Sequence, residues 1–163
     1  MFDPVGICRI LNEERVDYVV LGGFATVVHG SSLPTQDVDV LPSRNRDNLD
    51  RLGKALRRLN ARIRTGGDPV AAPMDGAFLL NMPLMLNLVT DLGDVDLTFE
   101  PSGTVGAFDQ WNSHALAVEI ASGVTVRIAS LDDIIESKRA ANRPKDIMAL
   151  PYLESLRDEL RGR

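Results

Sequence analysis

The stretch from Val16 to Pro42 constrains the fold of this chain more than any other part of the sequence. VDYVVLGG predicts a strand that ends at a pair of glycines, FATVVHG predicts a short helix, and QDVDVLP predicts a second strand that Pro42 stops. The second strand carries two aspartates in alternation with valines, which are typical of a buried strand. Because strands interleave with helices along the whole chain, we expect an α/β or α+β fold with a mixed β-sheet flanked by helices.

The remaining sequence shows no interdomain linker, so we expect a single domain over residues 1–163. Ser130 and Asp133 form a capping-box pattern before a helical C-terminal segment. Pro144 is expected to begin a further helix, which Pro151 should break or restart. The other expected elements are a helix over 46–60, strands over 61–65, 84–90 and 95–100, a loop over 66–76, a short helix over 102–112 and a hairpin over 115–129.

The composition argues against several classes of protein. A net charge of −5 is unsuited to a protein that coats nucleic acid non-specifically. No apolar run approaches the roughly 18 residues of a membrane span, and the first residues lack the pattern of a secretory signal. We therefore expect a cytoplasmic protein without a membrane partner. One cysteine and two histidines also argue against a zinc site.

Asp37 and Asp39 are the first candidate functional residues. Positions i and i+2 of a strand point to the same face, so the two carboxylates project together while Val38 faces the other way. Like charges at this spacing repel unless a cation or a proton lies between them, and Mg²⁺ binds hard oxygen ligands of this kind. The alternative is a pair of solvated acids on an edge strand, but the apolar Val38 and Val40 favour a metal site.

Gly22 and Gly23 lie where the first strand meets the short helix. Glycine lets the backbone approach a ligand closely, and a helix N-terminus presents free N–H groups with a partial positive charge. We therefore expect nucleotide phosphates at this turn; the alternative is a plain strand-to-helix turn. The sequence carries neither a Walker motif nor G-x-G-x-x-G.

A third acid is expected from a neighbouring strand. LGDVDLTFE offers Asp94 and Asp96, again in alternation. Asp96 lies deeper in the strand and is the candidate that completes the cluster with Asp37 and Asp39. Asp94 is interpreted as a turn residue because of its turn-like neighbours.

The segment KRAANRPKD supplies candidate cations. Lys138 lies four residues after Ile134 on the inner stripe of a predicted helix, which aims it at an anion inside the fold. The alternative is a lysine that snorkels to solvent from the helix end. Arg143, Lys145 and Asp146 follow at the start of the next helix, where they either add positive charge or hold the two helices together.

Two further features have structural interpretations. His29 is expected to cap or pack at a helix end, and His114 has no partner evident in the sequence. The basic stretch that best suits a nucleic-acid patch consists of Arg57, Arg58, Arg62 and Arg64. A solvated helix face explains this stretch at least as well, because aromatic stacking residues are missing nearby.

Taken together, these residues resemble the DNA polymerase β-like nucleotidyltransferase superfamily and, within it, the AbiEii-type group, which includes toxins of toxin–antitoxin systems. The resemblance runs from about Asp17 to Asp146, and its matching parts are Gly22-Gly23, an HG pair, Thr35-x-Asp37-x-Asp39, Asp96 and Lys138-x4-Arg143-x-Lys145-Asp146. It implies a nucleotidyltransferase fold, Mg²⁺ as the cofactor and an NTP as a substrate.

The resemblance also implies a role for each of these residues. Asp37 and Asp39 would hold two Mg²⁺ ions about 4 Å apart, and Asp96 would complete the metal site and help to activate an attacking hydroxyl. The catalytic residues would thus be Asp37, Asp39 and Asp96, and the nucleotide would be bound by Gly22, Gly23, Thr35, Lys138 and Arg143.

The implied reaction moves a nucleoside monophosphate from an NTP to a hydroxyl of an RNA such as tRNA, of a protein or of a small molecule. In the AbiEii-type group the enzyme would be a toxin with a cognate antitoxin. Leu33 stands where many members carry an arginine, so the alternative is a catalytically weak or inactive nucleotide-binding regulatory module. A third hypothesis is a structural protein whose acids are solvated.

Overall fold

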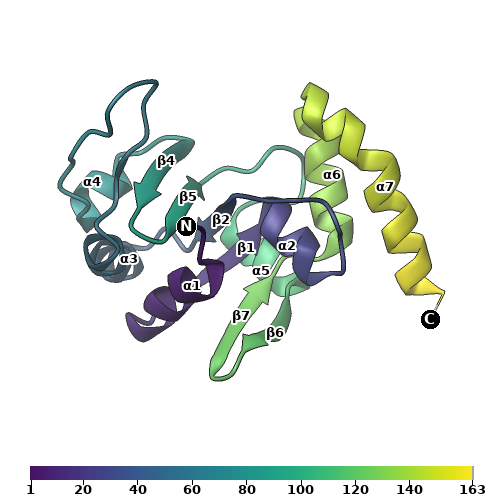
Figure 1. Ribbon diagram of the computed structural model, residues 1–163, viewed down its shortest axis with the longest axis horizontal. Coiled ribbons are helices and arrows are strands. Elements are labelled where there is room, and N and C mark those ends of the chain that lie inside the picture. Colours follow the sequence, from purple (N-terminus) through teal and green to yellow (C-terminus); the bar gives the residue numbers. More distant parts are fainter. Residues whose placement is uncertain (163) are drawn as a thin grey trace.

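The computed structural model describes residues 1–162 as one sheet of seven strands surrounded by helices (Figure 1). The strands are β1 (Tyr18–Leu21), β2 (Asp37–Pro42), β3 (Arg62–Ile63), β4 (Met85–Thr90), β5 (Gly93–Thr98), β6 (Leu116–Ala121) and β7 (Val124–Ile128). Their order across the sheet is β3-β4-β5-β2-β1-β7-β6, with parallel and antiparallel neighbours. The predicted mixed α/β fold with a helical C-terminal segment is confirmed.

Seven helices accompany these strands over residues 1–162: α1 (Pro4–Glu13), α2 (Gly22–Val28), α3 (Arg46–Arg58), α4 (Gly76–Leu80), α5 (Phe108–His114), α6 (Leu131–Ala141) and α7 (Pro144–Arg161). Ser130 caps α6 by accepting a hydrogen bond from Asp133 N at 3.2 Å, as the sequence predicts. The sequence pattern gives no sign of α4, and the short helix expected over 102–112 begins later, at Phe108.

The pairing of β2 decides where the acids lie. β2 runs antiparallel to β1 and parallel to β5. The parallel register places Asp37 beside Asp94 and Asp39 beside Asp96. Neighbouring strands lie less than about 5 Å apart, so the acids of two strands form one group on one face of the sheet.

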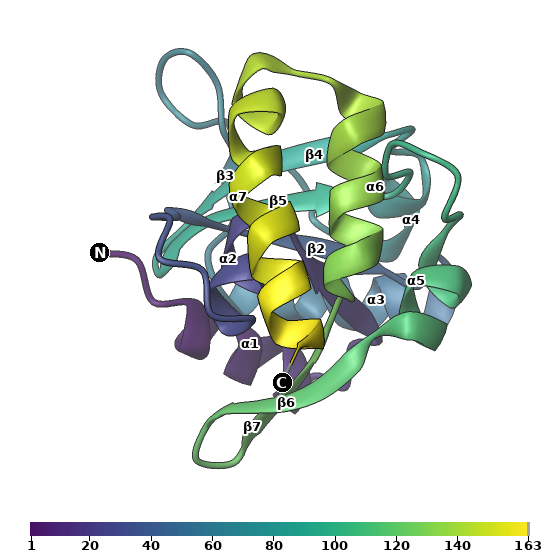
Figure 2. The ribbon, with the colours of Figure 1, turned by 90° about the vertical axis from the view of Figure 1, so that its right-hand side faces the viewer.

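The two faces of β2 have different surroundings. Val38 and Val40 alternate with the acids, are fully buried, and belong to the same core cluster as Ile7 of α1 and Leu52 of α3. On the other side, α6 and α7 pass in front of β2 and β5 in the view of Figure 2. Val38 and Val40 therefore face the apolar core, whereas the acids of β2 project from the opposite face of the sheet.

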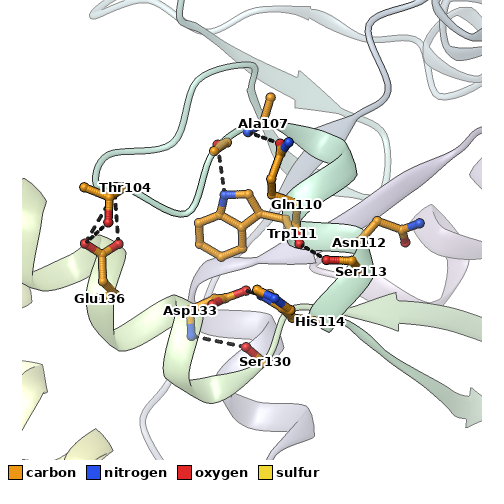
Figure 3. A network of polar contacts seen from close by, with 12 residues as sticks. Thr104, Ala107, Gln110, Trp111, Asn112, Ser113, His114, Ser130, Asp133 and Glu136 are labelled. Carbon is orange, nitrogen blue, oxygen red and sulfur yellow. Dashed lines mark hydrogen bonds and ion pairs between the residues drawn. The ribbon is translucent and has the colours of Figure 1, made fainter.

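Contacts from the chain around α5 fix the position of α6 (Figure 3). The Asp133 carboxylate lies 2.8 Å from His114 Nδ1, so His114 has a partner that the sequence does not reveal. About one turn further on, the Glu136 carboxylate accepts hydrogen bonds from the N–H and the hydroxyl of Thr104. Because these contacts hold α6, they also place Lys138, which lies near its end.

The expected break at Pro151 is wrong, because α7 continues as one helix through it. A proline inside a helix removes one i→i−4 hydrogen bond, here the bond to the carbonyl of Ile147. Ile147 is half exposed, so solvent is available near this carbonyl. Leu153, beyond the proline, is buried in a small apolar cluster shared with α6, and this packing keeps the helix continuous.

Within residues 1–162 no helix combines the length and the apolar composition that a membrane crossing needs.

Candidate active site

Three carboxylates meet on the face of the sheet that α6 and α7 cover. Asp37 and Asp39 come from β2 and Asp96 comes from β5, and one oxygen of each lies within 4.8 Å of the others. The convergence follows from the two-residue period of a strand and from the register that pairs Asp39 with Asp96. The structure thus brings together the three acids that the sequence analysis selected.

This acid cluster is partly shielded from solvent, because Asp37 and Asp39 are half-buried and Asp96 is buried. Asp96 is only 8% exposed, which excludes the solvated alternative for this residue. Burial raises the pKa of Asp39 to about 7, the charges of Asp37 and Asp96 add to the rise, and two nearby lysines oppose it. Burial, followed by the charge of Asp37, also raises the pKa of Asp96 against the opposing effect of Arg64. Carboxylates that resist ionisation in this way are stabilised by a divalent cation.

The two glycines make room for the acids and for Thr35. Gly22 has a φ of +64°, a conformation that favours glycine, and a Cβ at this position would lie 1.7 Å from Oδ2 of Asp39. A Cβ at Gly23 would lie 2.8 Å from Oγ1 of Thr35, and this hydroxyl donates to the carbonyl of Asp37 at 3.3 Å. The glycine turn is therefore packed directly against the acid cluster.

A buried carboxylate arranges the cations on the opposite wall. The Asp146 side chain is fully buried and lies 2.7 Å from Arg143 Nε and 3.5 Å from Lys138 Nζ. Burial alone would raise the pKa of Asp146, but the hydrogen bond from Arg143 and the charge of Lys138 outweigh it and lower the pKa. Lys145 lines the same wall. One acid thus contacts two cations, Arg143 and Lys138, and the contact with Lys138 also joins α7 to α6.

The acid cluster, the glycine turn and the cations line one pocket of about 630 Å³, a size typical of small-molecule and cofactor sites. Leu33 lines it too and is 39% exposed. The pocket contains every residue that the sequence analysis assigned to the site, namely Asp37, Asp39, Asp96, Gly22, Gly23, Thr35, Lys138 and Arg143.

Arg64 is the residue near the site that the sequence analysis missed. Its guanidinium lies 2.8 Å from Asp96 Oδ1 and 3.0 Å from Asp94 Oδ2. The interpretation of Asp94 as a turn residue is wrong, because Asp94 lies within β5 and pairs with Asp37. The alternating sequence DVD of β5 is the signal that could have shown that Asp94 and Asp96 share one face. Two carboxylates on one face need a cation beside them.

Arg57 and Arg58 of the basic stretch give no support to a nucleic-acid patch. Arg57 donates to a backbone carbonyl, and Arg58 forms ion pairs with Glu13 and Glu14. These arginines are therefore engaged in structural contacts. His29 ends α2 and its Nε2 lies 2.8 Å from a backbone carbonyl, which agrees with the expected capping or packing role.

The donor set of the acid cluster fits Mg²⁺. It offers carboxylate oxygens, the hard ligands that Mg²⁺ prefers. Among the described residues, Asp37, Asp39 and Asp96 are the one group of three or more His, Cys, Asp or Glu side chains close enough to share an ion. Burial and, after it, the charges of Asp37 and Asp96 raise the pKa of Asp39, and this cost of ionisation favours uptake of a cation.

Solved nucleotidyltransferases have the same fold. A proposed nucleotidyltransferase of Thermotoga maritima, TM1012, is 16% identical with a TM-score of 0.51, and the match covers 100% of this chain and 97% of that one. ANT(2'')-Ia in complex with adenylyl-2''-tobramycin is 16% identical with a TM-score of 0.55, and the match covers 96% and 94% of the two chains. The solution structure of the antibiotic-resistance factor ANT(2'')-Ia gives 14% identity, a TM-score of 0.55 and coverage of 98% and 91%. No family model and no curated protein matches the sequence. At these identities the likeness concerns the fold, and the chain has the fold of a nucleotidyltransferase.

Proposed function

We propose that the protein transfers a nucleoside monophosphate from an NTP to a hydroxyl group and releases pyrophosphate, with Mg²⁺ as its cofactor. One observation carries the proposal: Asp37, Asp39 and Asp96 converge on one wall of a pocket whose opposite wall carries Lys138 and Arg143. Carboxylates bind the metal that accompanies nucleotides, and cations bind the triphosphate. The fold shared with nucleotidyltransferases supports the same activity.

In this proposal the nucleotide is bound and oriented by Gly22, Gly23, Thr35, Lys138 and Arg143. The two cations reduce the negative charge that develops on the departing pyrophosphate. The glycines, which lack a Cβ, let backbone N–H groups approach phosphate oxygens. Because the nucleotide is held against the acid cluster, the reaction gains from proximity and orientation.

Asp37, Asp39 and Asp96 hold the metal through their carboxylate oxygens. Bound Mg²⁺ supplies charge neutralisation at the phosphate oxygens and makes a nearby hydroxyl more acidic. Asp96, whose pKa is raised by burial and by Asp37, is suited to accept the proton of the acceptor hydroxyl. As that proton leaves, the hydroxyl oxygen bonds to the α-phosphorus, and the bond from this phosphorus to pyrophosphate breaks.

The proposed acceptor is a hydroxyl of an RNA such as tRNA, of a protein or of a small molecule. ANT(2'')-Ia, which has the same fold, forms a complex with adenylyl-2''-tobramycin, a precedent for a small-molecule acceptor. The combined motif from Gly22 to Asp146 resembles the AbiEii-type group, and membership would make the protein a cytoplasmic toxin that has a cognate antitoxin. The identity of the labelled product distinguishes these acceptors.

A second candidate function is a nucleotide-binding regulatory module that does not catalyse transfer. Leu33 favours it, because this exposed apolar side chain lines the pocket where many proteins of the resembled family carry an arginine. An apolar side chain here removes one contact to phosphate or acceptor and leaves the acid cluster intact.

The test is incubation with each common NTP, labelled on the α-phosphate, with or without Mg²⁺, in the presence of total RNA, cell protein or aminoglycosides. Mg²⁺-dependent labelling of an acceptor that is lost in Asp37→Asn supports the transferase. Asp50→Asn is the matched control, because Asp50 is an exposed carboxylate paired with Arg46 on α3. NTP binding in calorimetry without transfer supports the regulatory module. A folded protein that shows neither binding nor transfer refutes both functions.

A further inference from the structure

Arg64 approaches the acid cluster from the edge of the sheet. It follows β3, and its backbone N–H donates to the carbonyl of Asn87 at 2.9 Å. Asn87 pairs with Asp96, which in turn pairs with Asp39. Asn87, Asp96 and Asp39 thus lie side by side in a row across β4, β5 and β2. Arg64 lies next to Asn87, at the outer end of this row. Its long side chain spans β4 to reach the carboxylates of β5.

The Arg64 guanidinium contacts two carboxylates of β5 at once. Nη1 lies 3.0 Å from Asp94 Oδ2 and Nη2 lies 2.8 Å from Asp96 Oδ1. Asp94 and Asp96 share a face because one residue separates them. The nitrogen near Asp96 donates a hydrogen bond to it, whereas the contact with Asp94 is an ion pair without a hydrogen bond. The planar fork of an arginine can reach both carboxylates, whereas a lysine ammonium is a compact point charge. The Asp96 side chain is 11% exposed and that of Arg64 is 31% exposed, so the contact with Asp96 is largely shielded from water.

We infer that Arg64 is a positioning residue that fixes the Asp96 carboxylate in the orientation facing Asp37 and Asp39, with Asp94 as its second anchor. Arg64 is not among the residues that line the pocket, so it acts through Asp96. A carboxylate has about four acceptor positions, and Arg64 uses one on Oδ1, which leaves others for a cation and an acceptor hydroxyl. The expected effect of Arg64 on nucleotide transfer rests on the proposed function, whereas its expected effect on cation binding does not.

The chain offers a matched control for this role. Arg58 also bridges two carboxylates, with distances of 2.7 Å to Glu13 and 3.2 Å to Glu14, but it joins α3 to the end of α1. Arg58→Gln therefore removes the same kind of ion pair without touching the acid cluster. An ion pair that merely ties elements together should behave like this control.

The test is a double-mutant cycle on Mn²⁺ binding, in which free Mn²⁺ is measured by electron paramagnetic resonance with the full chain. Asp96→Asn should weaken Mn²⁺ binding about tenfold in the wild-type background and less than about threefold in the Arg64→Gln background, because an Asp96 that is not held contributes little. In the Arg58→Gln background the loss should remain about tenfold. Arg64→Lys should restore only part of the coupling, and it replaces Arg64→Gln if that variant does not fold.

An equal loss of Mn²⁺ affinity on Asp96→Asn with and without Arg64 would overturn the inference, because the two residues would then act independently. Kinetics provide a second readout: Arg64→Gln should lower kcat about 10- to 100-fold with less than about a threefold change in the KM for NTP. A kcat and KM equal to those of Arg58→Gln would also overturn it. If the cycle shows coupling between Arg64 and Asp96 in Mn²⁺ binding but the wild type transfers no nucleotide, the positioning role of Arg64 is supported and only the proposed function is refuted.

Discussion

Replacement of Asp39 by asparagine tests the electrostatics of the site before any acceptor is known. Burial, with the charges of Asp37 and Asp96, raises the pKa of Asp39 from its ordinary value of 3.8 to about 7. Between these two pH values the folded state keeps a proton that the unfolded state has released. The stability linked to this group is therefore present below pH 3.8, falls as the pH rises towards 7, and stays low above it. Asparagine is neutral throughout this range.

The size of the effect follows from the shift. One pKa unit corresponds to about 1.36 kcal/mol, so the shift from 3.8 to about 7 amounts to about 4 kcal/mol of lost stability for the metal-free protein at pH 8. Asp39→Asn keeps the shape and removes the charge, so it should raise the free energy of unfolding by up to this amount at pH 8 and by less than about 1 kcal/mol at pH 4. Urea unfolding in EDTA at both pH values measures the difference.

Two further measurements make this prediction specific. Mg²⁺ should stabilise the wild type at pH 8 and leave Asp39→Asn nearly unchanged, because the cation offsets the repulsion that the substitution has already removed. Asp50→Asn, at an exposed surface ion pair, should change stability by less than about 1 kcal/mol at either pH. Loss of stability in Asp39→Asn at pH 8 in EDTA, or an equal gain at both pH values, would refute the reasoning.

Three other substitutions, with Gly30→Ala as a control, test the surroundings of the acid cluster. Gly22→Ala should cost more than about 1 kcal/mol of stability and prevent Mn²⁺ binding, because its Cβ would lie 1.7 Å from an oxygen of Asp39. Gly30→Ala, at a φ of +112° with open space around it, isolates the backbone strain in the same urea titration, and equal effects of the two variants would contradict the clash. Lys138→Met should raise the Kd for NTP about tenfold in calorimetry, and an unchanged Kd would remove this lysine from the nucleotide site. Asp146→Asn should lower the free energy of unfolding by about 2 kcal/mol at pH 7, because a fully buried carboxylate loses charged hydrogen bonds. The lowered pKa of Asp146 means that this stabilisation is lost as the pH falls towards that pKa, so the difference between wild type and variant should shrink in acid.

The acid cluster could be predicted from the sequence because its signal is local. Asp37 and Asp39 alternate with valines, and alternation on a strand fixes which side chains share a face. Asp96 repeats the pattern on β5. What the local pattern does not fix is the register, yet the pairing of Asp39 with Asp96 is what brings the third acid within reach. The sequence therefore identified the acids, and the pairing of the strands determined their distance.

Arg64 and Pro151 show where local reasoning ends. The sequence around Arg64 suits a basic patch, and its partner Asp96 lies 32 residues further along the chain. The contact depends on the order β3-β4-β5, which no pattern near Arg64 encodes. At Pro151 the local rule predicts a break in the helix, but burial of Leu153 against α6 outweighs one missing hydrogen bond. In both cases a tertiary contact decides the outcome.

The two flanks of the acid cluster are neutralised in different ways, and this difference orients a nucleotide in the proposed function. On the β3 side, one guanidinium, that of Arg64, faces two carboxylates, Asp94 and Asp96, so its charge is fully matched by the protein. On the side of α6 and α7, one buried acid, Asp146, lies among cations that line the pocket and outnumber it. A triphosphate is therefore attracted to the helices and not to the edge of the sheet. In the proposed function we therefore expect the acceptor to approach from the side of β4 and β5, where Asp96 would accept its proton.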